Sequence, residues 1–430
     1  MTAGFVYRDG QLCAEEVPLE KIARAVGTPA YVYSATAMRE RLHRLLGAFA
    51  GQRVVVCYAL KANANLAVVR TLAEAGAGAE IVSGGELQRA LAAGVPPSRI
   101  VFAGVGKSRE EMAAALDAGI AQFNVESVPE LIVLGELAAA RRERAPVAFR
   151  INPDVLAGGH DKISTGRRQD KFGIAYDRAL EAYETARRLA GIEIVGLHLH
   201  IGSQIGGLAP FEAAYGRAVD LVARLAERGI RLRRLDLGGG LPARYQGEPE
   251  FDLDGYAALV RELTAGLDLE LVLEPGRFLV AEAGVLLARA LYVKEGERPC
   301  VVLDAGMNDL LRPALYDAHH DILRVSEPVR GDVFQPVDVV GPICESADVF
   351  ARARELPPLA AGDLVALIGA GAYGAVMASD YNSRPIAAEV LVRGGSFAVV
   401  RPRIEPGVRL AEERMPEWLA SPAAGRAADS

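Results

Sequence analysis

The sequence predicts an α/β protein in which a (β/α)8 barrel of the TIM type is joined to a C-terminal all-β domain. Between residues 54 and 274, short apolar runs alternate with segments whose apolar residues recur at helical spacing. After residue 276 the helical spacing fades, and strand-like runs separated by Gly and Pro replace it. Eight strand–helix units in roughly 240 residues match the closing number and size of such a barrel.

The predicted barrel strands are continuous apolar runs, as expected for strands that are buried on both faces. Helix starts are marked by a Ser followed three residues later by a Glu, the capping-box pattern, at Ser83, Ser108 and Ser127. An open doubly wound sheet is the alternative arrangement of the same units. The predicted strands are Val54–Tyr58, Ala79–Val82, Ile100–Gly104, Ala121–Val125, Val147–Ile151, Ile194–His200, Leu235–Leu237 and Leu271–Glu274.

The all-β domain is expected to include both ends of the chain. The first 34 residues contain strand-like stretches at Phe5–Tyr7 and Ala30–Tyr33. The predicted division is therefore 35–275 for the barrel, and 1–34 with 276–430 for a β-sandwich or barrel-like domain. Its further predicted strands are Val285–Val293, Cys300–Leu303, Val337–Val340, Leu364–Ile368, Ala387–Val392 and Phe397–Val400.

Composition excludes several classes of protein. The 430 residues include 48 Lys and Arg against 55 Asp and Glu, a net charge of −7, which argues against a nucleic-acid partner. Four widely spaced Cys rule out a disulfide framework. The polar segment Met1–Gln11 lacks a signal peptide's apolar region, and no apolar run approaches the ~18 residues of a membrane span. We expect a cytoplasmic enzyme or binding protein.

Residues that can take part in catalysis or ligand binding follow several predicted strands, at the end of the barrel where active sites form. Lys61 follows an apolar run, and desolvation lowers the pKa of a Lys and makes it a nucleophile that forms Schiff bases with aldehydes. Gly238–Gly240, with Gly276 and Arg277 after the next strand, offers backbone N–H groups to a phosphate. Each feature alone can also be purely structural: the Lys can be an ordinary surface residue, and the glycines can form a tight turn. Together they indicate pyridoxal phosphate, whose ring nitrogen needs an acidic partner such as Glu274.

Two histidines lie two residues apart, so His198 and His200 share one face of their strand. A same-face pair can indicate a metal, but no third ligand of suitable spacing is evident, and we predict no metal site. One ring is expected to stack on the cofactor, and the other can be a hydrogen-bonded core histidine.

The segment Gly369–Gly374 fits the G-x-G-x-x-G pattern and follows a predicted strand. A dinucleotide-binding fingerprint also needs a following helix and an acidic residue about 20 positions later. The turn-like Ser379–Pro385 follows instead. We therefore reject binding of NAD at this motif.

Six motifs, taken in order along nearly the whole chain, resemble the diaminopimelate decarboxylases, a family of fold-type III pyridoxal-phosphate enzymes. The segment Leu310–Tyr316 points to this branch in particular. Leu60 and Pro242 depart from the family pattern, where Val and Gly are expected, and Pro242 can alter the loop beside the phosphate. The six motifs are Tyr58-Ala-Leu-Lys-Ala-Asn63, His200-Ile-Gly-Ser-Gln204, Leu237-Gly-Gly-Gly240, Glu274-Pro-Gly-Arg277, Gly341-Pro-Ile-Cys-Glu345 and Gly371-Ala-Tyr-Gly374.

The resemblance implies a role for each motif. Lys61 would hold pyridoxal 5'-phosphate covalently, His200 would stack on its ring, and Glu274 would pair with the ring nitrogen. Cys344 would be the acid that returns a proton, and Glu345 would meet a substrate ammonium group. Phosphate contacts are implied for Ser203, Gly239, Gly240, the Glu274–Pro275–Gly276–Arg277 backbone and Tyr373, and substrate contacts for Arg277, Arg312, Tyr316, Glu345 and Tyr373.

The residues themselves agree with two of these roles. Two Arg side chains suit a substrate with two carboxylates, because each can bind one in a bidentate way. Arg312 precedes Pro313, so it is biased away from helix and is expected to project from a turn. Cys344 follows Gly-Pro, whereas the other three Cys lie in or near apolar runs and are expected to be core residues.

The implied reaction is the loss of CO2 from meso-2,6-diaminopimelate to give L-lysine, the last step of lysine biosynthesis. The resemblance also implies a homodimer with shared active sites, in which Cys344 and Glu345 reach the neighbouring subunit's cofactor. Alternatives are a related decarboxylase of ornithine, carboxynorspermidine or carrier-bound glutamate, a fold-type III racemase, and a cofactor-binding homologue without turnover.

Overall fold

The computed structural model describes residues 4–155 and 171–419 of the chain, and its barrel matches the predicted one. Within these ranges eight parallel strands pair in sequence order, and the last pairs with the first, so the sheet closes into a ring. A two-residue strand, β10 (Ile174–Ala175), pairs in parallel with the last two residues of the fifth. The ring consists of β5 (Val54–Ala59), β6 (Gly78–Ile81), β7 (Ile100–Phe102), β8 (Gln122–Val125), β9 (Ala145–Asn152), β11 (Ile192–His198), β12 (Arg234–Asp236) and β13 (Glu270–Leu273).

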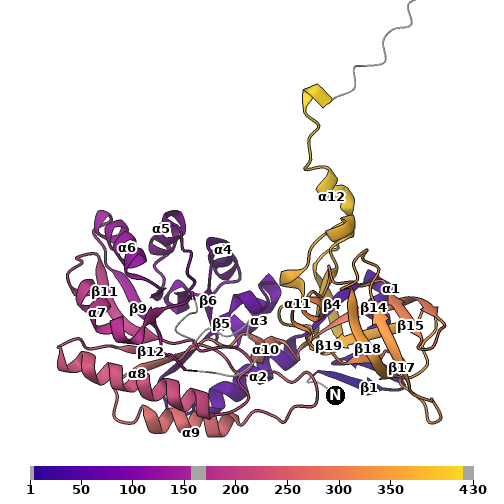
Figure 1. Ribbon diagram of the computed structural model, residues 1–430, viewed down its shortest axis with the longest axis horizontal. Helices are drawn as coiled ribbons and strands as arrows, with labels where there is room; N and C mark the ends of the chain where they lie inside the picture. Colours follow the sequence, from indigo (N-terminus) through magenta and orange to yellow (C-terminus); the bar gives the residue numbers. More distant parts are fainter. Residues whose placement is uncertain (1–3, 156–170, 420–430) are drawn as a thin grey trace, which may run out of the picture.

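Helices follow these strands and cover the outside of the ring (Figure 1). Ser83, Ser108 and Ser127 each cap a helix by accepting the N–H three residues on. The full reciprocal box forms only at Ser108, because the other two Glu side chains accept the N–H of the residue before the cap. The helices are α2 (Ala35–Ala48), α3 (Leu66–Glu74), α4 (Gly84–Ala92), α5 (Arg109–Ala118), α6 (Val128–Ala140), α7 (Ala179–Arg187), α8 (Ala209–Glu227), α9 (Leu253–Leu263) and the short α10 (Arg277–Val280).

The second domain is built of strands, as predicted, and its sheet is mainly antiparallel. Its strand order is β18-β17-β15-β14-β4-β20-β21, with β16 and β19 branching from β14. The sequence analysis did not predict two of these strands, β16 and β18. Strand β16 has only three residues, and three of the eight residues of β18 are charged. The strands are β4 (Ala30–Ser34), β14 (Gly284–Lys294), β15 (Cys300–Leu303), β16 (Ile322–Arg324), β17 (Gln335–Val340), β18 (Val349–Leu356), β19 (Leu364–Ile368), β20 (Ala388–Arg393) and β21 (Ser396–Arg401).

The N-terminal segment packs against this sheet. Strand β4 lies between β14 and β20, and a small sheet precedes it, formed by β1 (Phe5–Arg8), β2 (Gln11–Ala14) and β3 (Val17–Pro18). Helix α1 (Leu19–Val26) was not predicted. The remaining helices are the short α11 (Arg312–Tyr316) and α12 (Pro406–Leu410), and α12 projects away from the body in Figure 1.

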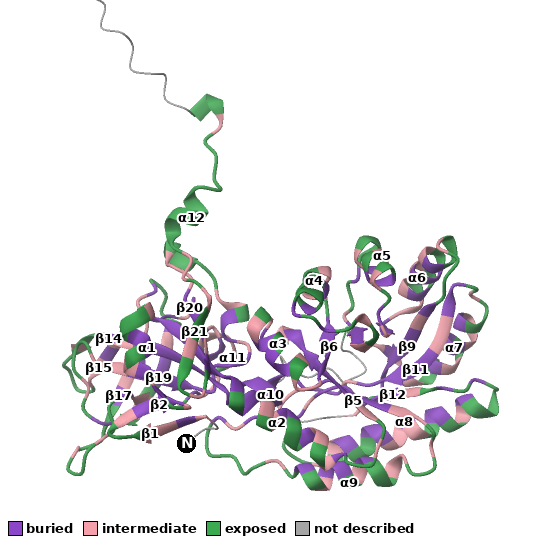
Figure 2. Cartoon of the chain, turned by 180° about the vertical axis from the view of Figure 1, so that it is seen from behind, coloured by how far each residue is buried: buried purple, intermediate pink, exposed green. Residues whose placement is uncertain are grey.

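The strands of the barrel are buried, as their colouring in Figure 2 shows, yet the ring contains several polar side chains. Barrel interiors are usually filled by branched apolar residues. Here the strands contribute buried polar groups, and several of them belong to the site described below. In the described part of the chain, no helix combines the length and the apolar character needed to cross a membrane. The buried polar or charged residues of the barrel strands are Glu80, Gln122, Asn124, Arg150, Asn152, His198 and Asp236.

Candidate active site

Lys61 lies directly after β5, in a 3₁₀ helix that spans Leu60–Ala62. Its Nζ donates to both carboxylate oxygens of Glu80, at 3.0 and 3.1 Å, and its side chain remains 36% exposed. Desolvation lowers the pKa of Lys61, but the charges of Glu80, Tyr373 and Glu274 outweigh it and place the pKa above its usual value. The predicted lowering is therefore wrong for this state, since Glu80 on the neighbouring strand keeps the amine protonated.

Glu274 follows β13 and is buried. Its Oε1 accepts from Asn124 Nδ2 at 2.9 Å, and its Oε2 lies 3.2 Å from His198 Nε2. Burial alone would raise the pKa of this carboxyl, but His198 and the Lys61 charge lower it to about 2. Glu274 is therefore ionised and can pair with a protonated ring nitrogen.

Asp236, at the end of β12, extends this cluster. Its Oδ2 accepts from Gln122 Nε2 at 3.1 Å, and its Oδ1 accepts from the Gly238 N–H at 3.0 Å. Burial and the neighbouring Glu274 charge raise the pKa of Asp236 well above its usual range, so one of the two acids holds a proton while the other is ionised.

The cluster also contains three potential metal ligands. Ligand atoms of His198, Asp236 and Glu274 lie within 4.8 Å of one another. Sequence spacing did not reveal this third ligand, because the three residues come from three different strands. The Glu274 carboxylate already contacts the Asn124 amide and the His198 imidazole. We keep the prediction that this cluster binds no metal.

The triple Gly brings the backbone close to His200 and Glu274. Gly239 N–H donates to His200 Nδ1 at 3.2 Å, which orients the imidazole. A Cβ on Gly239 would lie 2.5 Å from the Glu274 carbonyl oxygen, so only Gly fits there. Desolvation, together with the charges of Lys61 and Arg150, lowers the pKa of His200 well below its usual value. A neutral flat ring of this kind suits stacking on an aromatic cofactor.

Arg277 opens α10 and is buried, although it carries a charge. Its Nε donates to Ser203 Oγ at 3.3 Å, and its Nη1 donates to the Tyr245 hydroxyl at 3.0 Å. Its guanidinium carbon lies 4.6 Å from the centre of the Tyr373 ring. Tyr373 has a positive φ of 54°, and its N–H donates to Ala62 O, so the motif around Tyr373 lies beside Lys61.

Arg312 begins α11, so the expectation that it projects from a turn is wrong. Pro313 is the second helical residue, where the missing N–H has no partner to lose. Arg312 is buried, its guanidinium carbon lies 4.4 Å from the centre of the Tyr245 ring, and its Nη1 donates to His320 Nε2 at 2.7 Å. Tyr316, at the end of the same helix, is close enough to both arginines to affect their pKa values.

Cys344 and Glu345 lie in the loop between β17 and β18, and both are exposed. The Cys344 N–H donates to Asn382 Oδ1 at 2.9 Å, and the Glu345 N–H donates to Ile343 O at 2.7 Å. Among the described residues, neither side chain contacts Lys61 or the groups around it. The single chain therefore brings together the other predicted site residues and leaves these two exposed to solvent.

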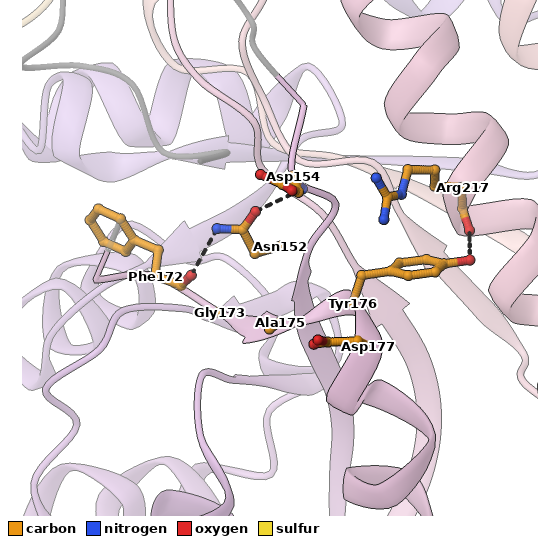
Figure 3. Close-up of a pocket in the computed structure, with 8 residues that line it drawn as sticks. All are labelled: Asn152, Asp154, Phe172, Gly173, Ala175, Tyr176, Asp177 and Arg217. Atoms are coloured by element: carbon orange, nitrogen blue, oxygen red, sulfur yellow. Dashed lines mark hydrogen bonds between the residues drawn. The ribbon is translucent and has the colours of Figure 1, made fainter. Parts of the chain in front are cut away.

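A separate hollow lies at the end of β9 (Figure 3). Asn152 donates to Phe172 O at 3.5 Å and accepts from the Asp154 N–H at 2.9 Å. The Arg217 guanidinium carbon lies 4.4 Å from the centre of the Tyr176 ring. None of the residues that line this hollow is among the predicted site residues.

Sequence reasoning missed several members of the site. Glu80 interrupts an apolar strand, which is an unusual place for a carboxylate and a usable signal. Tyr245 and His320 carried no comparable signal, because each lies in an irregular segment, where no residue periodicity shows which way a side chain points.

The fold and the site together define a pyridoxal-phosphate-dependent decarboxylase. The family model described as pyridoxal-dependent decarboxylase, pyridoxal binding domain, matches residues 35–281. The chain is 46% identical over 422 residues to the diaminopimelate decarboxylase of Zymomonas mobilis, covering 96% of this chain and 99% of that protein. It is 50% identical over 400 residues to the one from Pseudomonas aeruginosa, covering 93% and 96%. The chain belongs to the diaminopimelate decarboxylase family.

Solved structures agree with this assignment. The diaminopimelate decarboxylase of Helicobacter pylori, complexed with L-lysine, is 41% identical with a TM-score of 0.88, covering 92% of this chain and 99% of that one. The enzyme from M. jannaschii, also in complex with L-lysine, is 38% identical with a TM-score of 0.92, covering 97% and 99%. A lysine/ornithine decarboxylase from Vibrio vulnificus is less similar, at 26% identity and a TM-score of 0.76, covering 87% and 97%.

Proposed function

We propose that this chain removes CO2 from meso-2,6-diaminopimelate and releases L-lysine, with the cluster around Lys61, Glu274 and Arg312 as its active site. One observation carries the assignment of these residues. Among the residues that the structure describes, the buried cations Arg277 and Arg312 pair with no carboxylate. Burying a charge without a counter-ion is costly, so anionic groups of the ligands complete the site.

The residues present fit pyridoxal phosphate. Bound there, the cofactor supplies an electron sink for the electron pair that departing CO2 leaves behind. Lys61 would attach it covalently, and the ionised Glu274 would pair with the protonated ring nitrogen. The neutral His200 ring would pack against the cofactor ring. Ser203, Gly239, Gly240, the 274–277 backbone and Tyr373 would hold the phosphate.

The two carboxylates of the substrate differ, because one leaves as CO2 and the other remains in the product. A carboxylate that leaves as CO2 loses its charge, so a strong ion pair in the ground state would oppose its departure. The buried Arg312 would therefore hold the carboxylate that stays in the product, assisted by Arg277 and Tyr316. Glu345 would meet the ammonium group near that carboxylate. Cys344 would donate its Sγ proton to the carbon that has lost CO2.

The proposal includes a homodimer with shared active sites, since Cys344 and Glu345 face outward from their own subunit. It also includes a division into a barrel over 35–275 and a β domain formed by 1–34 with 276–430, which the pairing of β4 with β14 and β20 supports. The cytoplasmic location fits a chain whose four cysteines are all free, one of them exposed.

Release of CO2 from meso-diaminopimelate, lysine, ornithine and arginine, measured in parallel on the holoenzyme, tests the function. We expect turnover of meso-diaminopimelate alone. Faster release from ornithine would assign the chain to another decarboxylase branch.

Replacement of Glu274 by Gln should lower kcat by about 10² to 10³-fold, because a neutral amide no longer stabilises a protonated ring nitrogen. The measurement is kcat together with the absorbance spectrum of the bound cofactor. Glu270→Gln is the matched control, since Glu270 begins β13, the strand that Glu274 follows, but it pairs with Arg234 and is partly exposed. An unchanged kcat in Glu274→Gln would show that this carboxylate does not support the cofactor.

Replacement of Arg312 by Lys is expected to be damaging although the charge is kept, because an ammonium group cannot reproduce a planar two-point fork. The loss in kcat/KM should correspond to about 2–4 kcal/mol of transition-state binding. Arg324→Lys is the control, since Arg324 is a partly buried arginine of the same domain that pairs with Asp332. Equal kcat/KM values in wild type and Arg312→Lys would remove Arg312 from the substrate site.

A further inference from the structure

His320 connects Arg312 to the sheet of the β domain. It lies in the segment between α11 and β16 and is 1% exposed. Arg312 Nη1 donates to His320 Nε2 at 2.7 Å, and the Ile368 carbonyl oxygen lies 2.7 Å from His320 Nδ1. A guanidinium only donates and a carbonyl only accepts, so the two partners select the neutral tautomer with its proton on Nδ1.

The surroundings of the ring hold it in this state. The rings of His320 and Tyr245 meet edge to face, with centroids 5.5 Å apart. Gly369 has a φ of +72°, and a Cβ there would lie 3.2 Å from the Tyr245 ring, so the glycine leaves room for this pair. Burial and the adjacent Arg312 charge lower the pKa of His320 to about 3. The imidazole is therefore a neutral acceptor for Arg312 at physiological pH.

A neutral acceptor has a consequence for the charge of Arg312. Outside the pair formed by Arg277 and Arg312, the described structure gives well-covered arginines a carboxylate partner: the buried Arg150 meets Glu126 at 2.7 Å, and the partly buried Arg41 meets Glu282 at 2.8 Å. Those charges are compensated within the protein. A hydrogen bond that Arg312 donates to the neutral His320 Nε2 orients the guanidinium but leaves its full charge available.

We propose that His320 is a positioning and specificity-determining residue, which fixes one edge of the Arg312 guanidinium with a neutral nitrogen and reserves the charge and the remaining donors for a carboxylate of the ligand. The inference rests on the proposed function, in which Arg312 holds the carboxylate that the product retains. A carboxylate in place of His320 would cancel this charge and disfavour ligands that bear an anionic group there.

An isosteric pair of variants separates charge from shape. Both His320→Gln and His320→Glu place an oxygen acceptor near the Arg312 guanidinium, and both lose the bond to Ile368 O, but only Glu adds a negative charge. L-lysine, which retains one carboxylate, is titrated calorimetrically into the holoenzyme of each variant. We expect the dissociation constant to stay within about 3-fold of wild type in His320→Gln, and to rise about 30-fold or more in His320→Glu.

The steady-state kinetics of meso-diaminopimelate should divide in the same way. In His320→Glu the increase should fall mainly on KM, because the ligand's carboxylate then competes with a built-in one. Equal effects of Gln and Glu on lysine binding would overturn the proposal and leave His320 with a merely structural role. Arg312→Gln tests the proposed carboxylate site separately from the role of His320. If that variant binds L-lysine as wild type does, the proposed carboxylate site is itself wrong, and the role of His320 is overturned with it.

The tautomer can be tested in the unsubstituted protein, which does not depend on either variant folding. In protein labelled with ¹⁵N at its six histidines, His320 should show a protonated Nδ1 and an unprotonated Nε2 across roughly pH 5 to 8. The contact of this ring with the Arg312 guanidinium assigns the signals without any variant. A protonated Nε2, or titration of this ring within that range, would overturn the proposal.

Discussion

Replacement of Lys61 by Ala is expected to abolish covalent attachment of the cofactor and to lower kcat by on the order of 10⁴-fold or more. Lys61 lies just after β5, close enough to Glu274 for its charge to help lower the pKa of that carboxyl. Borohydride reduction of the wild-type holoenzyme should fix the cofactor to the one peptide that contains Lys61. Recovery of the label on a different lysine would sink this assignment.

The Ala variant leaves Glu80 without its cation, and a buried carboxylate that loses its partner can destabilise a protein by about 3–5 kcal/mol. Lys61→Arg is therefore the matched variant, because it keeps a positive charge beside Glu80 but offers no amine that condenses with an aldehyde. It should unfold at nearly the wild-type temperature and remain inactive. Wild-type turnover in Lys61→Arg would show that covalent attachment at this position is not required.

Mixed dimers of Lys61→Ala and Cys344→Ala chains are expected to recover activity that neither variant has alone. If Cys344 serves the neighbouring subunit, a mixed dimer has one site with both lesions and one with neither. A two-fold interface creates two equivalent composite sites, so random exchange of equal amounts leaves about a quarter of all sites intact. Activity should recover to about that fraction of wild type.

The control is exchange itself, which native mass spectrometry of differently labelled chains measures. Exchange without recovered activity would mean that each site is built within one chain, and that a dimer, if present, is only structural. Mixing Lys61→Ala with Lys61→Arg supplies the negative reference, because no combination of these chains contains an intact Lys61.

Much of the fold could be predicted because the relevant forces act locally along the chain. Continuous apolar runs such as Val54–Tyr58 indicate strands that are buried on both faces, and their number indicated closure. Carboxyl ends of parallel strands meet at one edge, so the sequence also placed Lys61, His200 and Glu274 together. The wrong predictions also have local causes. The charged residues of β18 obscured the apolar pattern of a strand, and Pro313 after Arg312 argued against the helix α11 that begins there.

The ionic state of the site could not be predicted, because it depends on which strands become neighbours. Sequence reasoning treated Lys61 as an isolated desolvated amine and expected a lowered pKa. The pairing of β5 with β6 places the buried Glu80 3.0 Å from its Nζ, and at that distance the attraction outweighs desolvation. In the same way, His198, Asp236 and Glu274 meet only because β11, β12 and β13 lie side by side.

The sequence by itself determined the barrel, the cofactor chemistry and the family, since these depend on residue types and their order along the chain. Only the tertiary structure decided how the charges are compensated. It left Arg312 with a neutral partner, His320, gave Arg277 the hydroxyl of Tyr245, and assigned Glu80 to Lys61. The physical reason is that electrostatic energy depends on distances through space, which closure of the ring and docking of the β domain fix and residue spacing does not.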